Sequence, residues 1–421
     1  MARVGRGGPA DRAWRAAVVL GWVLLACAFA LALLLPAVFG DGCPCRDQAG
    51  GRVLVLATSG DLWVAPAAAR YVANGALGFV YESSPYLTAL PLYPIVLAPL
   101  VAVGQALGLS EPPAPAPTMW FLLAPFTVGL AVPLLHQVRG LVRDADAGGA
   151  ALSAQAWTAV LVAVPVLVVF GHGEDALALL GVLAAVRLAA RERWAEAGLL
   201  LGLAVASKQW AVLALPALLA RCGPRERGRL AAACLALPAA LALLVLAVDW
   251  AHASRALLHP PNYPGYGHAA PWVHAGAATV ATAPFRLGAL TLAIALAGRG
   301  RGGASRLLAV LGVTLLARCA FEPVVHVYYL GPGLCLLLLH ERVATGRCAR
   351  TAVLGSLLVA WFEVQPAPAL WWAVAAALGV AVAYRAGREA LSGTAATAAT
   401  GGDVRPPRGT AARPAATSWW S

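Results

Sequence analysis

The chain has 421 residues, of which 60% are hydrophobic and only 12% are charged. A soluble globular domain carries about 25% charged residues, so this composition excludes a water-soluble globular protein and predicts that the lipid bilayer is the solvent. The net charge of +12 comes almost entirely from arginines in short clusters between apolar runs. Such clusters are typical of cytoplasmic loops that contact anionic lipid head groups, so we expect membrane lipids, and not nucleic acid, as partners.

The N-terminal segment carries four arginines before its first apolar run, Ala17–Gly40. This run is longer than the core of a signal peptide, which is about 7–15 residues. The sequence therefore predicts a cytoplasmic N-terminus and a retained first helix that leads outward, with a cleaved signal peptide as the alternative. Cys43 and Cys45 follow this helix in a compartment that can oxidise thiols, and a disulfide that involves them is left open.

Residues 40–86 are the longest hydrophilic region of the N-terminal half and are predicted to form a first outer loop. Within it, the spaced aromatic and small apolar residues of Leu62–Ala76 predict a helix in the membrane interface. Apolar segments follow at 88–108 and 119–138, and the arginines after them predict a cytoplasmic loop. Two full crossings from the outside would end outside, so the sequence leaves open whether one segment is re-entrant or the charge rule fails here.

The middle of the chain predicts two helices around a polar turn, followed by an interrupted helix. Apolar runs at 152–170 and 176–190 flank the turn Gly171–Asp175. The stretch 197–220 has basic clusters at both ends, so a single crossing would place one cluster outside. Two short helices that meet near Ser207-Lys208-Gln209 keep both clusters inside, and interrupted helices with polar tips are common where a membrane protein builds a site.

The C-terminal half predicts a second outer loop at 249–275 and a series of further spans. These spans are expected at 230–248, 277–297, 306–320, 327–340, 351–364 and 368–384. The sequence thus predicts one all-α, multi-pass domain of the cell membrane, residues 1–389, with about eleven to thirteen spans. Residues 390–421 show little periodicity and are predicted to form a disordered cytoplasmic tail.

Three short polar motifs lie between the apolar runs. The first comprises Thr58-Ser59-Gly60-Asp61, Ala67–Tyr71, Gly75, Val80-Tyr81-Glu82 and Leu92-Tyr93-Pro94. The second comprises Phe170–Asp175, Ala197–Ala204 and Ser207-Lys208. The third comprises Phe321-Glu322-Pro323, His326 and Tyr328-Tyr329. In order and spacing, these motifs resemble the GT-C superfamily of lipid-donor glycosyltransferases, most closely the polyprenol-phosphate-dependent mannosyltransferases of the GT87 type.

The resemblance implies a GT-C-like helical bundle with a long first outer loop. It also implies an inverting enzyme that moves a sugar, mannose in that family, from a polyprenyl-phosphate donor to a glycan or glycolipid acceptor at the outer face. The acceptor hydroxyl must lose its proton as it attacks the sugar, and one carboxylate can act as that general base. Resemblance and chemistry together point to Asp61 as this base.

The departing lipid phosphate develops negative charge and needs fixed donors or cations. Lys208 and Arg318 are the candidates, with extension of the cation to the membrane interface as the simpler alternative. His172, Glu174 and Asp175 are predicted to orient sugar hydroxyls or to bind a divalent cation with Asp61, although Asp175 can instead cap the following helix. The remaining donor- or acceptor-binding candidates are Arg70, Tyr71, Glu82, Glu322, His326 and Tyr329.

Other function classes stay open. A transporter or flippase needs ionisable residues paired at mid-membrane depth and two related halves, whereas this sequence places its charges at predicted helix ends and shows no internal symmetry. No residue argues against a non-catalytic scaffold. For each single acidic residue, a solvated loop position is the simpler interpretation, because orientation bias alone also gathers acids on one side.

Overall fold

The computed structural model describes residues 60–83, 87, 89–110, 118–145, 151–258, 268–269, 283–301, 303–322, 324–362 and 369–381, with a few isolated positions near the N-terminus and Tyr384. Of the predicted first helix, residues 18–23 and 26 are described and are helical, whereas the cysteine pair Cys43 and Cys45 and the tail 390–421 lie outside the described residues.

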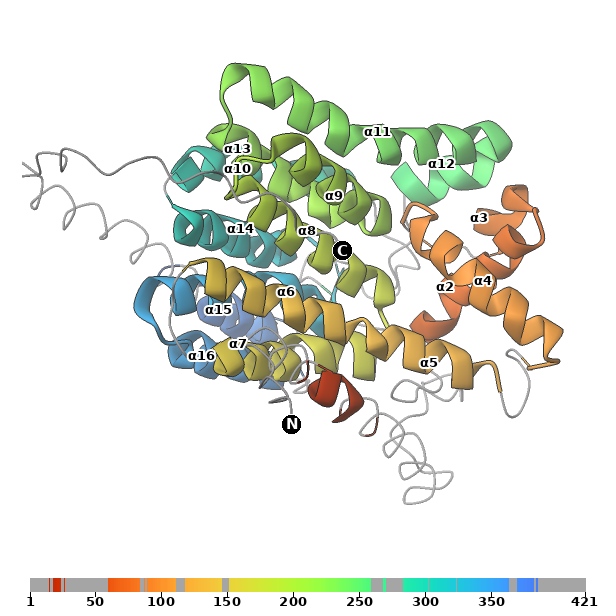
Figure 1. Ribbon diagram of the computed structural model, residues 1–421, viewed down its shortest axis with the longest axis horizontal. Helices are drawn as coiled ribbons and strands as arrows, with labels where there is room; N and C mark the ends of the chain where they lie inside the picture. Colours follow the sequence, from red (N-terminus) through yellow and green to blue (C-terminus); the bar gives the residue numbers. More distant parts are fainter. Residues whose placement is uncertain are drawn as a thin grey trace, which may run out of the picture.

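Helices make up nearly all of the described structure (Figure 1). Those before the middle of the chain are α2 (Gly60–Ala73), α3 (Val80–Ser83), α4 (Leu92–Ala106), α5 (Trp120–Gly129), α6 (Ala131–Asp144), α7 (Ala151–Thr158) with a π-helical continuation (Ala159–Val169), α8 (Gly173–Ala189) and α9 (Trp194–Ser207). Those that follow are α10 (Leu215–Arg221), α11 (Pro224–Val248), α12 (Trp250–Leu258), α13 (Ala283–Ala297), α14 (Ala304–Arg318), α15 (Gly331–Thr345), α16 (Ala349–Trp361) and a last helix Ala369–Ala381.

Four helical segments are long and apolar enough to cross a membrane. They are Phe121–Asp144, Ala151–Val169, Pro224–Val248 and Ala304–Phe321. Among the described residues, the only strands are β1 (His268–Ala269) and β2 (Val324–Val325), which pair antiparallel. The prediction of an all-α protein with membrane-spanning helices is confirmed at this level, whereas the predicted number of spans stays a prediction.

Glycines set how closely the central helices pack. A Cβ on Gly198 would lie 2.6 Å from the carbonyl oxygen of Leu230, and one on Gly202 would lie 2.7 Å from that of Cys234. Only glycine permits this approach of two backbones, which is common between membrane helices. Because both residue numbers rise together, α9 and α11 run parallel, and the chain between them must turn back.

That return begins where the sequence predicts an interruption. α9 ends at Ser207, Lys208 has an extended backbone, and a 3₁₀ segment from Gln209 to Ala214 leads into α10. α8 runs antiparallel to α9, because Gly181 lies against Ala204 whereas Glu174, earlier in α8, contacts Lys208, which follows α9. The prediction of two short helices that meet at Lys208 is therefore confirmed, and the first residues of α8 and the last of α9 share one end of the bundle.

The opposite end of α8, which we call the basic end, is held by an ion-pair cluster. Arg187 donates from Nε to Asp144 Oδ2 at 2.6 Å, and Arg191 donates from Nη2 to the same oxygen at 2.7 Å. Asp144 is the last residue of α6. We call the end where α8 begins and α9 ends the site end, since the polar motifs gather there.

The α4–α5 hairpin explains why two apolar segments precede one basic cluster. Tyr93 lies 3.3 Å from Thr127 through their hydroxyl oxygens, and Gly104 lies against Met119, so α4 and α5 pair antiparallel. The hairpin extends beyond the site end, and α6 alone continues from it to the basic end (Figure 1). Of the two apolar segments, only the second therefore connects the two ends.

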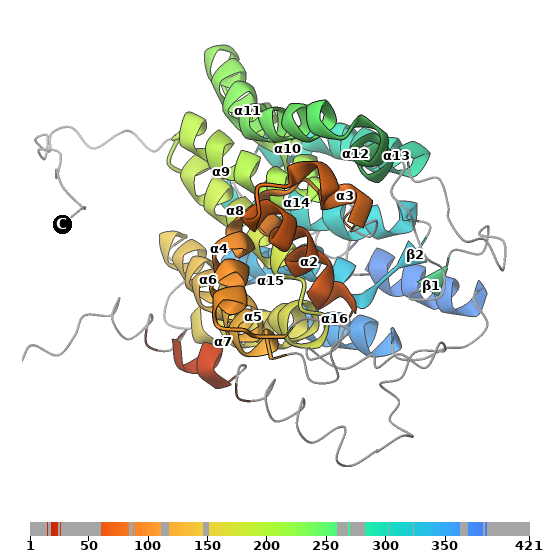
Figure 2. The same cartoon turned by 90° about the vertical axis from the view of Figure 1, so that its right-hand side faces the viewer.

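The first part of the predicted outer loop 249–275 forms α12, and its place outside the membrane stays a prediction. Asp249 starts this helix, because its Oδ1 accepts a hydrogen bond from the backbone N–H of His252 at 3.2 Å. α11 leads into α12 along one side of the molecule (Figure 2). Leu243 on α11 is 68% exposed, as expected of a helix whose outer face meets lipid.

Candidate functional site

The site begins in the turn between the π-helical segment and α8. The backbone N–H of His172 donates to the carbonyl oxygen of Val166 at 2.8 Å, and Gly171 adopts a φ of +69°, which favours glycine. At the next glycine, Gly173, a Cβ would overlap the phenolic ring of Tyr93. The Tyr-Pro start of α4 and the turn before α8, two motifs far apart in sequence, are therefore in direct contact.

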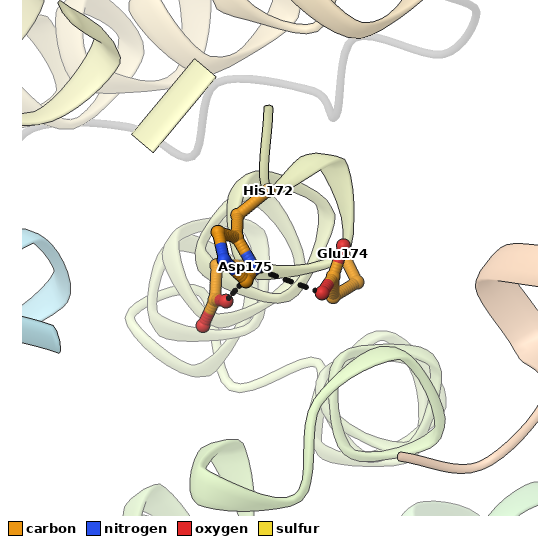
Figure 3. A group of neighbouring side chains, drawn as sticks. All are labelled: His172, Glu174 and Asp175. Carbon is orange, nitrogen blue, oxygen red and sulfur yellow. Dashed lines mark hydrogen bonds and ion pairs between the residues drawn. The ribbon is translucent and has the colours of Figure 1, made fainter. Parts of the chain in front are cut away.

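Three side chains converge in this turn (Figure 3). His172 Nδ1 lies 3.0 Å from Glu174 Oε1 and 3.4 Å from Asp175 Oδ2. Glu174 and Asp175 occupy the first turn of α8, where the helix dipole favours negative charge. Figure 3 shows both carboxylates on the same side of the turn as the imidazole ring.

Lys208 lies between the two carboxylates. Its ammonium donates to Glu174 Oε1 at 3.1 Å and lies 3.3 Å from Asp175 Oδ2. The helix interruption brings it there, because α9 ends one residue earlier. Burial alone would raise the pKa of the Glu174 carboxyl, which lies outside the four candidate spans. The positive charges of Lys208 and His172 outweigh burial and hold this pKa well below its usual range.

Asp175 is the most buried of these acids, with its side chain 3% exposed. The indole Nε1 of Trp210 donates to its Oδ1 at 2.6 Å. The alternative that Asp175 caps α8 is wrong, because the N-cap position belongs to His172 and carries no side-chain cap. Asp175 instead ties α8 to the 3₁₀ segment after the helix interruption.

A second charged group lies beside Trp210, at the end of α14. The guanidinium carbon of Arg318 lies 4.9 Å from the ring centroid of Tyr329 and 6.0 Å from that of Trp210. Arg318 Nε is 3.6 Å from Glu322 Oε1, which is too long for a hydrogen bond. Within the part of the chain that the structure describes, Arg318 makes no hydrogen bond, although the residue is only 7% exposed.

Aromatic rings join the two charged groups. The rings of His172 and Tyr328 stack with centroids 3.9 Å apart. The ring of His326 also stacks with that of Tyr328, with centroids 5.2 Å apart. Tyr328 meets Tyr329 edge to face at 4.9 Å. The structure therefore brings eight of the predicted residues into one cluster: His172, Glu174, Asp175, Lys208, Arg318, Glu322, His326 and Tyr329.

The predicted residues of the first motif lie in α2 and α3. Arg70 lies over the ring of Tyr71, with its guanidinium carbon 5.2 Å from the centroid, and Glu82 is exposed on α3. Asp61 is the second residue of α2, and its side chain lies outside the described residues. Ala65, one turn later, packs in the same apolar cluster as Tyr93, so α2 is linked to the site through α4.

Several residues of the cluster have no predicted role in the sequence. Tyr93 and Trp210 contact it directly, and Arg286 donates from Nη1 to Gln209 Oε1 at 2.8 Å. The adjacency of Trp210 to Lys208 is a local signal for its role. Nothing in the sequence near Arg286 indicates that it meets Gln209, which lies 77 positions earlier.

A divalent cation is the one cofactor that the sequence leaves open. His172, Glu174 and Asp175 offer ligand atoms that lie within 4.8 Å of one another, and their types suit several metals. Lys208, however, contacts the same carboxylate oxygens, Glu174 Oε1 and Asp175 Oδ2. A metal would have to displace this ammonium, so the residues as arranged do not fit a metal site.

Comparison of the chain with protein-family models, with characterised proteins and with solved structures gave no match.

Proposed function

We propose that the chain is a membrane-embedded, inverting glycosyltransferase that moves a sugar from a polyprenyl-phosphate donor to a glycan or glycolipid acceptor. The active site lies on the extracytoplasmic side of the cell membrane, and both termini lie in the cytoplasm. Mannose is the expected sugar, on the resemblance alone. The acceptor is a hydroxyl of a glycan or glycolipid of the cell envelope.

One observation carries this proposal: the polar motifs that resemble the lipid-donor glycosyltransferases gather at one end of the helical bundle. Residues of the second and third motifs contact one another through Trp210, Tyr328 and Tyr329. The first motif reaches the same place through Tyr93, which lies against Gly173. The arginine clusters lie at the other end, as the charge rule for the cytoplasmic side requires.

Each charged residue then has a separate role. Asp61 is the general base that accepts the proton of the acceptor hydroxyl as its oxygen bonds to the anomeric carbon. The bond from that carbon to the phosphate oxygen breaks at the same time, and Arg318 stabilises the charge on the departing phosphate. Lys208 is engaged by two carboxylates, so we assign it to positioning the Glu174 and Asp175 side chains that orient the sugar.

The test is transfer of radiolabelled mannose from polyprenyl-phosphate mannose in native membranes that contain the overexpressed chain. Wild type should transfer label above the background of empty membranes, and Asp61→Asn should lower the rate by about 10²–10⁴-fold, the usual contribution of a general base. Glu196→Gln, an exposed acid near the basic end, is the matched control and should behave as wild type. Equal rates for wild type, Asp61→Asn and empty membranes, with mannose and with other sugars on the same lipid, would contradict the proposal.

A transporter or flippase is the second candidate, and one observation favours it. Lys208 lies at a helix interruption and pairs with two acids, which is an arrangement that transporters use to bind and couple solutes. The two functions separate in vesicles. A transporter would move intact lipid-linked sugar across the membrane without new glycosidic product, whereas a transferase releases free polyprenyl phosphate.

A further inference from the structure

Two arginines at the site end have donors without an acceptor among the described residues. Arg318 is buried, carries no hydrogen bond within the described structure, and has a buried Nε without a hydrogen-bond partner. Burial of a polar group without a hydrogen bond is costly, and burial of a charge is costlier. A guanidinium in this state is expected where a ligand supplies the acceptors.

Arg286 is the second arginine and lies in the first turn of α13. It is half-buried, and its Nη1 donates to Gln209 Oε1 at 2.8 Å and to the carbonyl oxygen of Leu257 at 3.2 Å. Both acceptors are neutral, so no described carboxylate accepts a hydrogen bond from it. These two bonds orient the guanidinium, and its other donors make no hydrogen bond among the described residues.

The same two residues of the 3₁₀ segment hold both arginines. Gln209 accepts from Arg286, and the ring of its neighbour Trp210 faces Arg318 at 6.0 Å. α13 and the end of α14 are in contact as well, since a Cβ on Gly288 would lie 2.7 Å from the ring of Phe321. The two guanidinium groups therefore contact the side chains of two adjacent residues, Gln209 and Trp210.

The charges around the two arginines are not balanced. Lys208 is neutralised by Glu174 and Asp175. Glu322 is the only described acid paired with Arg318, at 3.6 Å, and no described acid pairs with Arg286, so the two arginines carry one more charge than the acids paired with them. An anion with several acceptor oxygens fits this arrangement, because a guanidinium presents paired donors that match phosphate geometry.

We propose that Arg318 and Arg286 together form a receptor for a phosphate ester, in which Arg318 supplies the buried contact and Arg286 the second. The ring of Tyr329 lies against Arg318 as well, with the guanidinium carbon 4.9 Å from its centroid. This inference deepens the proposed function and rests on it for the lipid source of the phosphate. Arg286 is a substrate-binding residue that no sequence motif indicates.

The test is direct binding of three probes to the purified full-length protein in detergent, measured by calorimetry. The probes are farnesyl phosphate, inorganic phosphate and uncharged farnesol. We expect farnesyl phosphate to bind, and Arg318→Gln and Arg286→Gln each to weaken it about ten- to hundredfold, which corresponds to one charge-assisted hydrogen-bond contact. Arg255→Gln removes an exposed arginine of α12 near the same end and should leave binding unchanged.

The three probes distinguish a lipid-linked phosphate from a free phosphate as the natural ligand. Competition by inorganic phosphate at similar concentration would assign the receptor to a free anion, and its failure to compete would assign it to a lipid-linked phosphate. Equal binding of farnesol and farnesyl phosphate, or unchanged binding in Arg286→Gln, would overturn the receptor. Arg286 is half-buried, so this variant still tests the proposal if Arg318→Gln does not fold. If both variants bind farnesyl phosphate like wild type while wild type transfers sugar, the receptor alone is refuted. If wild type binds farnesyl phosphate through the two arginines but transfers no sugar, only the proposed function is refuted.

Discussion

Two cations at the site end, Lys208 and Arg318, differ in what surrounds them. Lys208 contacts two carboxylates at 3.1 and 3.3 Å. Arg318 is more deeply buried and lies beside aromatic rings. The one carboxylate paired with it, that of Glu322, lies 3.6 Å away, which is too far for a hydrogen bond. The sequence suggests the same role for both, namely contact with a phosphate. The structure separates a cation that is bonded within the protein from one that makes no hydrogen bond among the described residues.

The largest effect on stability is expected at Lys208. Lys208→Met leaves Glu174 and Asp175 without their cation, and breaking a buried ion pair by removing one partner costs about 3–5 kcal/mol. Thermal unfolding in detergent should show a large fall in the midpoint. The double variant Lys208→Met with Glu174→Gln should recover part of it, and Arg191→Met at the exposed basic end should change stability by less than about 1 kcal/mol.

Arg318 should respond in the opposite way. Arg318→Gln has no hydrogen bond to lose but leaves Glu322, 3.6 Å away, without its cation, so we expect a smaller loss of stability than for Lys208→Met. Transfer of sugar should fall about 10²–10³-fold, because a fixed donor to the developing phosphate charge is lost. If the unfolding midpoint of Arg318→Gln instead falls as far as that of Lys208→Met, Arg318 has a structural role and does not differ from Lys208 in this respect.

Trp210 connects the two cations, and its substitution should have an intermediate effect. Trp210→Phe keeps the aromatic ring near Arg318 but removes the 2.6 Å hydrogen bond to Asp175. Leaving a buried carboxylate oxygen without this donor should cost about 1–3 kcal/mol. The unfolding midpoint measures this cost, and an unchanged midpoint would show that Asp175 is held by Lys208 alone.

The sequence predicts much of the helix pattern and part of the site. Apolar runs predict α8 and α14 within a few residues, and the basic clusters on both sides of 197–220 predict the interruption at Lys208, because both signals are local. The contacts of Tyr93 with Gly173 and of Arg286 with Gln209 depend on how helices far apart in sequence pack. No periodicity or composition encodes that register, so these residues could not be assigned from the sequence.

The pH dependence of stability should show the smallest effect. The pKa of Glu174 is lowered in the folded state, so the stability that its ion pair provides is complete above the unfolded pKa of about 4.3. It is lost only as pH falls through the lower folded pKa. The difference in unfolding midpoint between wild type and Glu174→Gln should therefore stay constant from about pH 8 to pH 5 and narrow only below about pH 4. A decrease already between pH 7 and 5 would show that Lys208 does not hold the carboxylate charged.

The central claim is sugar transfer from a lipid phosphate at this cluster, and its most direct test is product stoichiometry in reconstituted vesicles. The purified chain is supplied with doubly labelled polyprenyl-phosphate mannose and a membrane extract as the source of acceptor. The account predicts one free polyprenyl phosphate for each sugar transferred by wild type, and neither product with Asp61→Asn. Wild-type vesicles that move the intact donor across the bilayer, without releasing lipid phosphate, would contradict it.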